Sequence, residues 1–208
     1  MKHLINKPDT PKTDKTLLFS HGAGAPMDSD YMTFIAQAIA DHGVAVVRFE
    51  FPYMQERRAT GKKRPPDRMP KLMASFEEQV AAWGGADKCV AAGKSMGGRV
   101  ASMLLSENLV TAAVSLGYPF HPPGKPEKVR KDHWQSIMRP WLIVQGTRDP
   151  YGKPPEVEQY GLPQSAQLHW LEDGDHDFKP RKASGLLQED HWLQAAAWVA
   201  DFVKGLDA

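Results

Sequence analysis

The chain has 208 residues, a formal net charge of +1 at pH 7 and 41% hydrophobic residues. We therefore expect one domain, residues 1–208, with a sizeable core. A charge this close to zero offers no general attraction to nucleic acid or to an anionic membrane, so we expect neither as a partner. No apolar run approaches the roughly 18 residues that a membrane-spanning helix needs. The polar stretch 1–15 lacks the apolar segment of a secretory signal.

The number and spacing of cysteine, histidine and acidic residues indicate the cellular compartment of the protein and whether it binds a metal ion. Cys89 is the only cysteine, so no internal disulfide can form, which fits a reducing compartment. We expect a cytoplasmic protein. The acidic run 173–177 lacks the glycine and glutamate spacing of a calcium loop, and no pair of histidines has zinc-ligand spacing. We therefore expect no metal ion and no organic cofactor, while the oligomeric state stays open.

Short apolar segments alternate with segments of helical periodicity along the chain. Apolar runs, often β-branched, predict strands at residues 3–6, 16–20, 44–49, 89–92, 112–116, 141–145 and 167–171. Apolar side chains three and four residues apart predict helices at residues 31–42, 67–83, 100–105 and 189–205. Near-continuous apolar strands separated by helices indicate an α/β fold. We expect a mostly parallel sheet of about six or seven strands, covered by helices on both faces.

Two loops leave the carboxyl ends of predicted strands, the edge at which ligands bind in parallel sheets. Residues 50–68 look irregular and carry six basic side chains. We interpret them as a mobile, solvated loop or, alternatively, as a loop that attracts an anionic substrate. The stiff, proline-rich loop 117–126 either forms a wall of a substrate pocket or has no contact role. Only the basic loop and residues 116–141 could form a lid, so we expect an open, shallow pocket with little or no lid.

The most informative stretch has the sequence Gly-Lys-Ser-Met-Gly at residues 93–97 and follows the strand predicted at 89–92. A Gly-x-Ser-x-Gly turn between a strand and a helix is typical of a nucleophile elbow, in which the serine hydroxyl is exposed and the glycines let the two elements pass closely. The N–H group of Met96 would then face an oxyanion. One alternative is a purely structural turn. Another is a phosphate-binding Walker A loop, which needs a glycine where Lys88 stands.

A second glycine-rich turn, His-Gly-Ala-Gly at residues 21–24, follows an earlier strand. Small residues let a backbone N–H group approach a substrate carbonyl, so Ala23 or Gly24 is a candidate for the second oxyanion donor. The alternative is a flexible connecting loop. Candidate substrate-binding side chains come from this turn and from the proline-rich loop: His21, Tyr118 and His121.

An acid and a histidine follow later strands. Asp149 comes just after the strand at 141–145, and His176 follows the strand at 167–171. The order serine, acid, histidine is that of the α/β-hydrolases and differs from the orders in chymotrypsin and subtilisin. We therefore predict a catalytic triad of Ser95, Asp149 and His176, although each residue alone has a structural explanation. Three other aspartates near the histidine compete for the role of the acid: Asp173, Asp175 and Asp177.

Two basic residues flank the predicted nucleophile. We interpret Lys94 as a side chain that lies across the elbow toward solvent, and Arg99 as an ion-pair partner on the face of the following helix. We expect neither of them to take part in catalysis.

Four segments resemble the small α/β-hydrolase family that includes testis-expressed protein 30 and KAT8 regulatory complex subunit 3, and more broadly the dienelactone hydrolases. They are residues 19–24, 93–99, 117–124 and 146–149, and the likeness extends over 17–203. This resemblance implies the α/β-hydrolase fold and hydrolysis as the class of reaction. Dienelactone hydrolases usually carry a cysteine nucleophile, whereas this chain has Ser95, which favours ester or thioester chemistry.

The predicted function is therefore a serine hydrolase that cleaves a carboxylic ester or thioester of a small molecule through an acyl-enzyme intermediate. Two alternatives stay open. One is a catalytically weak or inactive interaction module on the same fold. The other is an acyltransferase that uses the same triad and passes the acyl group to an acceptor other than water.

Overall fold

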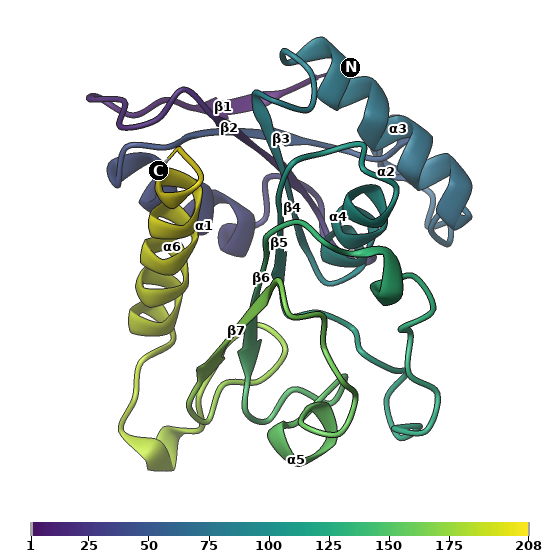
Figure 1. Cartoon of the computed structure of the whole chain (residues 1–208), viewed down its shortest axis with the longest axis vertical. Coiled ribbons are helices and arrows are strands. Elements are labelled where there is room, and N and C mark those ends of the chain that lie inside the picture. The colour runs from purple at the N-terminus through teal and green to yellow at the C-terminus, as the bar shows by residue number, and fades with distance from the viewer. Residues whose placement is uncertain (1, 208) are drawn as a thin grey trace.

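Seven strands form one sheet in the computed structural model, which describes residues 2–207 (Figure 1). The strands are β1 (Leu4–Asn6), β2 (Thr16–Ser20), β3 (Ala45–Phe49), β4 (Cys89–Lys94), β5 (Ala113–Leu116), β6 (Trp141–Gly146) and β7 (Ala166–Leu171). Their order across the sheet is β1-β3-β2-β4-β5-β6-β7. Strand β1 is antiparallel to β3, and the other neighbouring strands are parallel.

Helices cover both faces of this sheet. They are α1 (Asp30–Asp41), α2 (Pro52–Thr60), α3 (Met69–Ala82), α4 (Met96–Ser106), α5 (Pro154–Val157) and α6 (Gln188–Gly205), with short 3₁₀ turns η1 (Trp134–Ser136) and η2 (Lys182–Ser184). Figure 1 shows α1 and α6 on one side of the sheet and α3 and α4 on the other. The predicted fold class is confirmed. Within residues 2–207, no helix is both long and apolar enough to cross a membrane.

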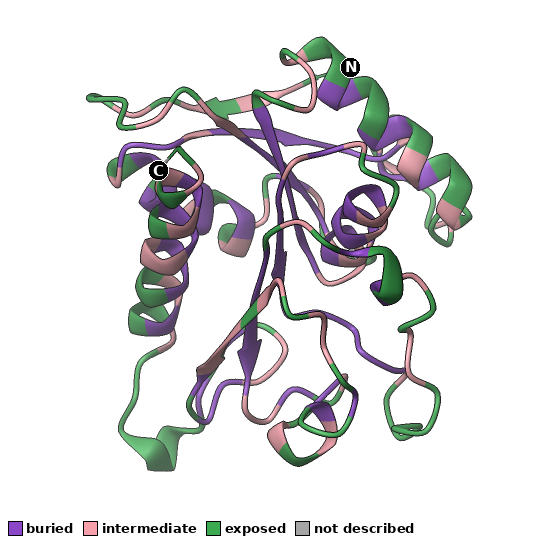
Figure 2. Ribbon diagram, in the orientation of Figure 1, coloured by how far each residue is buried: buried purple, intermediate pink, exposed green. Residues whose placement is uncertain are grey.

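Successive side chains of the central strands are divided between two buried clusters. Leu17 and Phe19 of β2 belong to the cluster beneath α1 and α6, whereas Leu18 belongs to the cluster beneath α3 and α4. Because both faces are covered, the strands are almost continuously apolar, as parallel sheets require. Figure 2 shows buried strands between helices whose outer faces are exposed.

Helix α1 shows how local chemistry sets the ends of an element. Oγ of Ser29 accepts a hydrogen bond from the N–H group of Met32 and so satisfies one of the free donors at the helix start. Gly43 follows the helix with a φ of +96°, a conformation that residues with a side chain rarely adopt. The helix that was predicted at residues 31–42 thus spans Asp30–Asp41, one residue earlier at each end.

The expectation of an irregular loop over residues 50–68 is wrong, because Pro52–Thr60 form helix α2. Only Tyr53 and Met54 of this helix are buried, so its apolar residues are too few to show helical spacing. The helix begins at a proline, whose restricted φ suits the first turn, and it ends at Gly61, which has a φ of +68°.

Carboxylates neutralise part of the positive charge in this region. Nε of Arg58 lies 2.7 and 2.8 Å from the two carboxylate oxygens of Glu50, which is 2% exposed. Arg64 contacts Asp67 at 3.1 Å. The same aspartate accepts a hydrogen bond from the N–H group of Tyr53 at 2.9 Å and thus caps α2 from outside the helix. The Arg58 contact ties α2 to the end of β3, and the Asp67 contact with Tyr53 ties α2 to the segment before α3.

Strand β4 and helix α4 pass so closely that only glycine fits at the contact. A Cβ atom on Gly93 would lie 2.1 Å from the backbone carbonyl carbon of Gly97, and one on Gly97 would lie 2.4 Å from Oγ of Ser20. Between the two glycines, Ser95 has a φ of 51° and a ψ of −113°, a strained conformation for a residue with a side chain. This close approach is what a nucleophile elbow requires.

We expect Gly93→Ala to lower the free energy of unfolding by about 1–3 kcal/mol, because the added methyl group overlaps backbone atoms and forces β4 and α4 apart. Chemical denaturation of the purified protein measures this change. Gly205→Ala is the matched control, since nothing lies within 4 Å of its Cβ position and alanine favours the helix. A Gly93→Ala protein as stable as the parent would contradict the close packing described above.

Candidate active site

Three side chains from separate loops meet at the carboxyl edge of the sheet. Ser95 lies between β4 and α4, Asp149 follows β6, and His176 follows β7. Nε2 of His176 is 2.9 Å from Oγ of Ser95, and its Nδ1 is 2.7 Å from Oδ2 of Asp149. The structure thus brings the three predicted residues into one chain of hydrogen bonds. In such a chain the carboxylate orients the imidazole, and the imidazole faces the hydroxyl as a base.

Asp149 is held in place by burial and by a second hydrogen bond. It is 0% exposed, and its Oδ1 accepts a hydrogen bond from the N–H group of Tyr151 at 2.9 Å. The ring of Tyr151 lies 4.5 Å from that of His176, centroid to centroid. A buried carboxylate with both oxygens bonded has little freedom to move. It therefore holds the imidazole in one orientation.

The three competing aspartates have other partners. Asp173 accepts hydrogen bonds from an arginine side chain. Asp175 accepts hydrogen bonds from two N–H groups of its own turn. Asp177 pairs with Lys94 at 3.2 Å. Asp149 is thus the acid that contacts the imidazole, a distinction that the sequence could not make because all four aspartates follow strand ends.

Both turns that were predicted to supply oxyanion donors border Ser95. Met96 is the first residue of α4, where an N–H group has no acceptor within the helix. Ala23 and Gly24 line the cavity at Ser95, and within residues 2–207 their N–H groups donate no hydrogen bond. The hydroxyl of Tyr53 donates to two carbonyl oxygens of their turn, at 3.2 and 3.1 Å. These bonds fix the backbone of the turn beside the serine.

His21 does not line this cavity, which corrects its prediction as a substrate contact. It is 0% exposed, and its Nε2 accepts a hydrogen bond from the N–H group of Phe51 at 3.1 Å. Burial lowers the pKa of the His21 imidazole below its ordinary value. The ring therefore joins the end of β2 to the start of α2 and supports the glycine-rich turn from beneath.

Tyr118 and His121 also lie away from the cavity, so the structure corrects these two predicted substrate contacts as well. Tyr118 is 0% exposed, and its hydroxyl accepts a hydrogen bond from Nε1 of Trp134 at 3.3 Å. His121 is 1% exposed, and its Nε2 lies 3.2 Å from a carboxylate oxygen of Glu156. The proline-rich loop folds back onto an aromatic cluster, which the sequence could not show because the cluster is assembled from distant segments.

The cavity at Ser95 has a volume of about 330 Å³. Its walls are the glycine-rich turn, the start of α1, Tyr151 and the loop that carries His176. No residue of 117–126 lines it, so the interpretation of that loop as a pocket wall is wrong. Gly24 is exposed at the rim, and the cavity opens to solvent.

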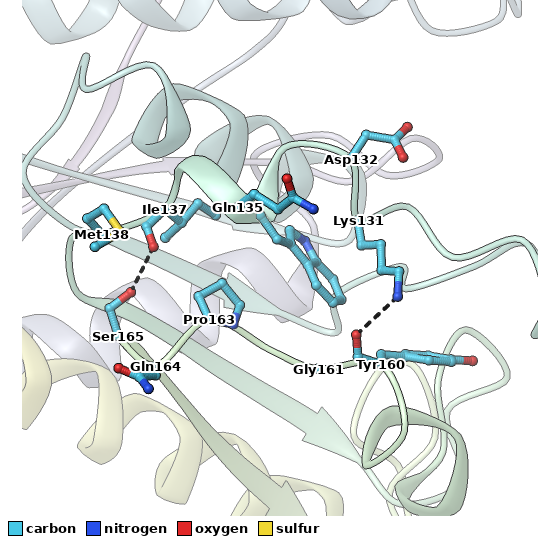
Figure 3. Close-up of a pocket in the computed structure, with 11 residues that line it drawn as sticks. Lys131, Asp132, Gln135, Ile137, Met138, Tyr160, Gly161, Pro163, Gln164 and Ser165 are labelled. Atoms are coloured by element: carbon cyan, nitrogen blue, oxygen red, sulfur yellow. Dashed lines mark hydrogen bonds between the residues drawn. The ribbon is translucent and has the colours of Figure 1, made fainter.

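A larger cavity of about 540 Å³ lies elsewhere, between the segments 131–138 and 160–165 (Figure 3). Ser165 is the one serine among the described residues that line this cavity. Its Oγ donates a hydrogen bond to the carbonyl oxygen of Ile137 at 3.4 Å. No histidine lines this cavity to act as a base. The side chains therefore favour the smaller cavity at Ser95 as the candidate active site.

The structure places Lys94 and Arg99, the two basic residues near Ser95, differently from their interpretation. Lys94 is 7% exposed, and its Nζ donates a hydrogen bond to the carbonyl oxygen of His176. Arg99 makes no ion pair with a carboxylate of residues 2–207, and its Nε is buried without a hydrogen-bond partner in that range. The position of Lys94 at the end of an apolar strand was the one signal along the chain for its burial, because every residue of β4 is buried.

The remaining histidines and acids are spread over the protein. Among residues 2–207, no group of three or more histidine, cysteine, aspartate or glutamate side chains could hold a metal ion. His133 lies 2.9 Å from Oγ of Ser102, and burial lowers the pKa of its imidazole to about 4. This histidine is a neutral hydrogen-bonding partner in the α4 layer.

Three solved structures resemble this chain over nearly its whole length. Est1E from Butyrivibrio proteoclasticus, solved with ferulic acid bound, is 15% identical, with a TM-score of 0.68 over 99% of this chain and 93% of that one. A dienelactone hydrolase from Anabaena variabilis is 19% identical, with a TM-score of 0.67 over 96% and 89%. A serine hydrolase without a lid from Xanthomonas campestris is 22% identical, with a TM-score of 0.66 over 95% and 88%. At these identities the likeness establishes the fold.

The sequence itself also matches a family model. The model described as "Alpha/beta hydrolase domain" matches residues 13–204, a span that runs from just before β2 to the last turn of α6. The match includes the serine, the aspartate and the histidine that meet at the carboxyl edge of the sheet. The chain therefore belongs to the Alpha/beta hydrolase domain family and is an α/β hydrolase.

Proposed function

We propose that this α/β hydrolase cleaves a carboxylic ester or thioester of a small molecule, with Ser95 as its nucleophile. The observation that carries the proposal is the hydrogen-bonded chain from Ser95 through His176 to Asp149 at the edge of an open cavity. Family membership supports hydrolysis as the class of reaction. The names of similar structures, among them a dienelactone hydrolase and Est1E with ferulic acid bound, are compatible with an ester substrate.

In the proposed mechanism, His176 accepts the proton of the Ser95 hydroxyl while the serine oxygen attacks the acyl carbonyl. Asp149 keeps the ring oriented and stabilises the imidazolium. The imidazolium then donates its proton to the departing alcohol or thiol as the C–O or C–S bond breaks, which leaves the acyl group on the serine. Water attacks this acyl-enzyme with the imidazole again as base, and the carboxylic acid is released.

Backbone N–H groups stabilise the negative charge on the carbonyl oxygen in this proposal. One donor is Met96, at the N-terminus of α4, where the helix dipole also favours negative charge. The other is Ala23 or Gly24, in the turn that faces the serine across the cavity. One such donor is worth about 3–4 kcal/mol of transition-state stabilisation.

Three narrower proposals accompany this function. All seven described strands belong to one sheet, which supports a single domain over residues 1–208. The single cysteine, Cys89, is free and buried, which supports a cytoplasmic location. The sequence Gly-Lys-Ser-Met-Gly-Gly-Arg at residues 93–99 supports a closer relation, within the family, to testis-expressed protein 30 and KAT8 regulatory complex subunit 3.

We expect Ser95→Ala to reduce kcat on generic esters and thioesters by up to about a millionfold, because no other group can form the acyl-enzyme. A fluorophosphonate probe should label the parent protein and leave Ser95→Ala unlabelled. Ser184→Ala, which removes an exposed hydroxyl in η2, is the matched control and should keep full activity. Undiminished hydrolysis by Ser95→Ala would refute the proposed nucleophile. A parent protein that neither turns over nor reacts with the probe would favour the interaction module.

We expect Asp149→Asn to lower kcat about 10⁴-fold, because the amide favours the wrong imidazole tautomer and leaves Nε2 protonated toward the serine. Steady-state kinetics on the best ester found for the parent measures this loss. Asp190→Asn, an exposed aspartate in the first turn of α6, should have unchanged kinetics. If Asp149→Asn kept more than a tenth of the parent rate, another carboxylate would have to be the orienting acid.

A further inference from the structure

The residue before the nucleophile contacts the backbone of the catalytic histidine. Lys94 is the last residue of β4, and its side chain runs along the cavity at Ser95. Its Nζ donates a hydrogen bond to the carbonyl oxygen of His176. The same nitrogen lies 3.2 Å from Oδ1 of Asp177. One short stretch of chain therefore supplies both the hydroxyl that faces the histidine ring and the ammonium that holds the histidine backbone.

This ammonium group is buried at a cost that its surroundings only partly offset. Burial lowers the pKa of Lys94 below its ordinary value, while the carboxylates of Asp177 and Asp149 act in the opposite direction. The Tyr31 and Phe178 ring centroids lie 5.4 and 5.9 Å from Nζ, within the range of cation–π attraction. Asp177 is an exposed partner, so solvent screens its attraction. A lysine that served packing alone would be better replaced by an apolar residue.

The neighbouring strand leaves room for this contact. Gly117, just after β5, has a φ of +65° and no side chain. A Cβ atom there would lie 2.9 Å from Nζ of Lys94 and 3.1 Å from the carbonyl oxygen of His176. A side chain at residue 117 would therefore press on both partners of this hydrogen bond. The ends of β4 and β5 and the loop after β7 are thus arranged so that the ammonium reaches this carbonyl.

The histidine loop is anchored differently on its two sides. On the side of α6, Nε1 of Trp192 donates to the carbonyl oxygen of Asp177 at 3.0 Å, and Nδ1 of His191 lies 2.8 Å from the carbonyl oxygen of Phe178. Both contacts involve the residues after the histidine. On the side of the nucleophile, the backbone of His176 itself is held by Lys94.

We propose that Lys94 is a positioning residue, whose ammonium holds the backbone of His176 so that the imidazole stays within hydrogen-bond reach of Ser95. This inference rests on the proposed triad. Loss of the contact lets the loop shift while Ser95 and the cavity stay in place, and a displacement of about 1 Å in such a site costs about 100-fold in rate. We expect the loss to lower kcat and to leave KM unchanged, because Lys94 holds the histidine and does not itself bind the substrate.

The test compares kcat and KM of Lys94→Met with those of the parent on one activated ester. Methionine keeps the length and apolar character of the stem and removes the N–H donors. We expect kcat to fall about 10- to 100-fold with KM unchanged within about threefold. Proton NMR reports on the position of the imidazole. The resonance of the proton between Nδ1 of His176 and Asp149 should shift or broaden in Lys94→Met, measured at a temperature where the variant is fully folded.

Two controls separate the effect of the Lys94 hydrogen bond to His176 from that of the ion pair with Asp177 and from that of removing any lysine. Asp177→Asn removes the exposed ion pair and leaves the Lys94 hydrogen bond to His176, so a loss of kcat in Lys94→Met that is at least about threefold greater than the loss in Asp177→Asn assigns the effect to the carbonyl contact. Lys88→Met removes a lysine whose surface ion pair with Asp14 lies far from the site, and it should have no effect. If Lys94→Met does not fold, Lys94→Gln serves instead, since its shorter amide does not reach the carbonyl and should lower kcat in the same way.

The outcomes are distinct from those that test the triad. If Ser95→Ala is inactive and the Lys94 variants keep the parent kcat, the positioning role is overturned and the triad stands. A rise in KM at unchanged kcat would also overturn it, because Lys94 would then bind substrate directly. If Ser95→Ala remains active, the proposed function fails first, whatever the Lys94 variants do.

Discussion

The near-contact of β4 and α4 is the constraint on which the rest of this site depends. Where Gly93 and Gly97 meet, no Cβ atom fits, and the turn between them holds Ser95 at a φ of 51°. The hydroxyl is thereby held at the carboxyl edge of the sheet, beside the first free N–H group of a helix. Because backbone packing sets this arrangement, the position of Ser95 does not depend on the rotamers of other side chains.

The acid and the histidine reach the same edge because parallel strands end together there. Asp149 is rigid, since it is buried just beyond β6 and both of its oxygens are hydrogen-bonded. The histidine is farther from its strand and lies in a partly exposed loop, so it needs additional contacts. Its ring is held by the aspartate and its backbone by Lys94. Burying the charged groups of Asp149 and Lys94 at this edge lowers the stability of the fold. The cost falls where the proposed chemistry needs a fixed geometry.

Patterns along the chain failed where the role of a residue depends on distant partners. Helix α2 has few apolar residues, and a carboxylate 14 positions away, Asp67, caps it. Tyr118 and His121 follow a strand end, as site residues do, but their loop turns back onto an aromatic cluster that includes Trp134. Lys94 was interpreted as a surface residue because lysine is usually exposed, although it ends a strand that is buried throughout. In each case the residue contacts a partner far away in the sequence, and local periodicity does not predict such contacts.

The sequence by itself determined the fold class, the glycine-flanked turn that holds Ser95 and the loops that carry Asp149 and His176. Apolar periodicity and the steric need for glycine on either side of Ser95 are local properties, so they can be read along the chain. Only the tertiary structure decided that Asp149, and not Asp175 or another neighbouring aspartate, contacts His176, and which side chains line the cavity. These outcomes depend on strand register and on the paths of loops between strands, which are set by packing between segments that lie far apart in the sequence.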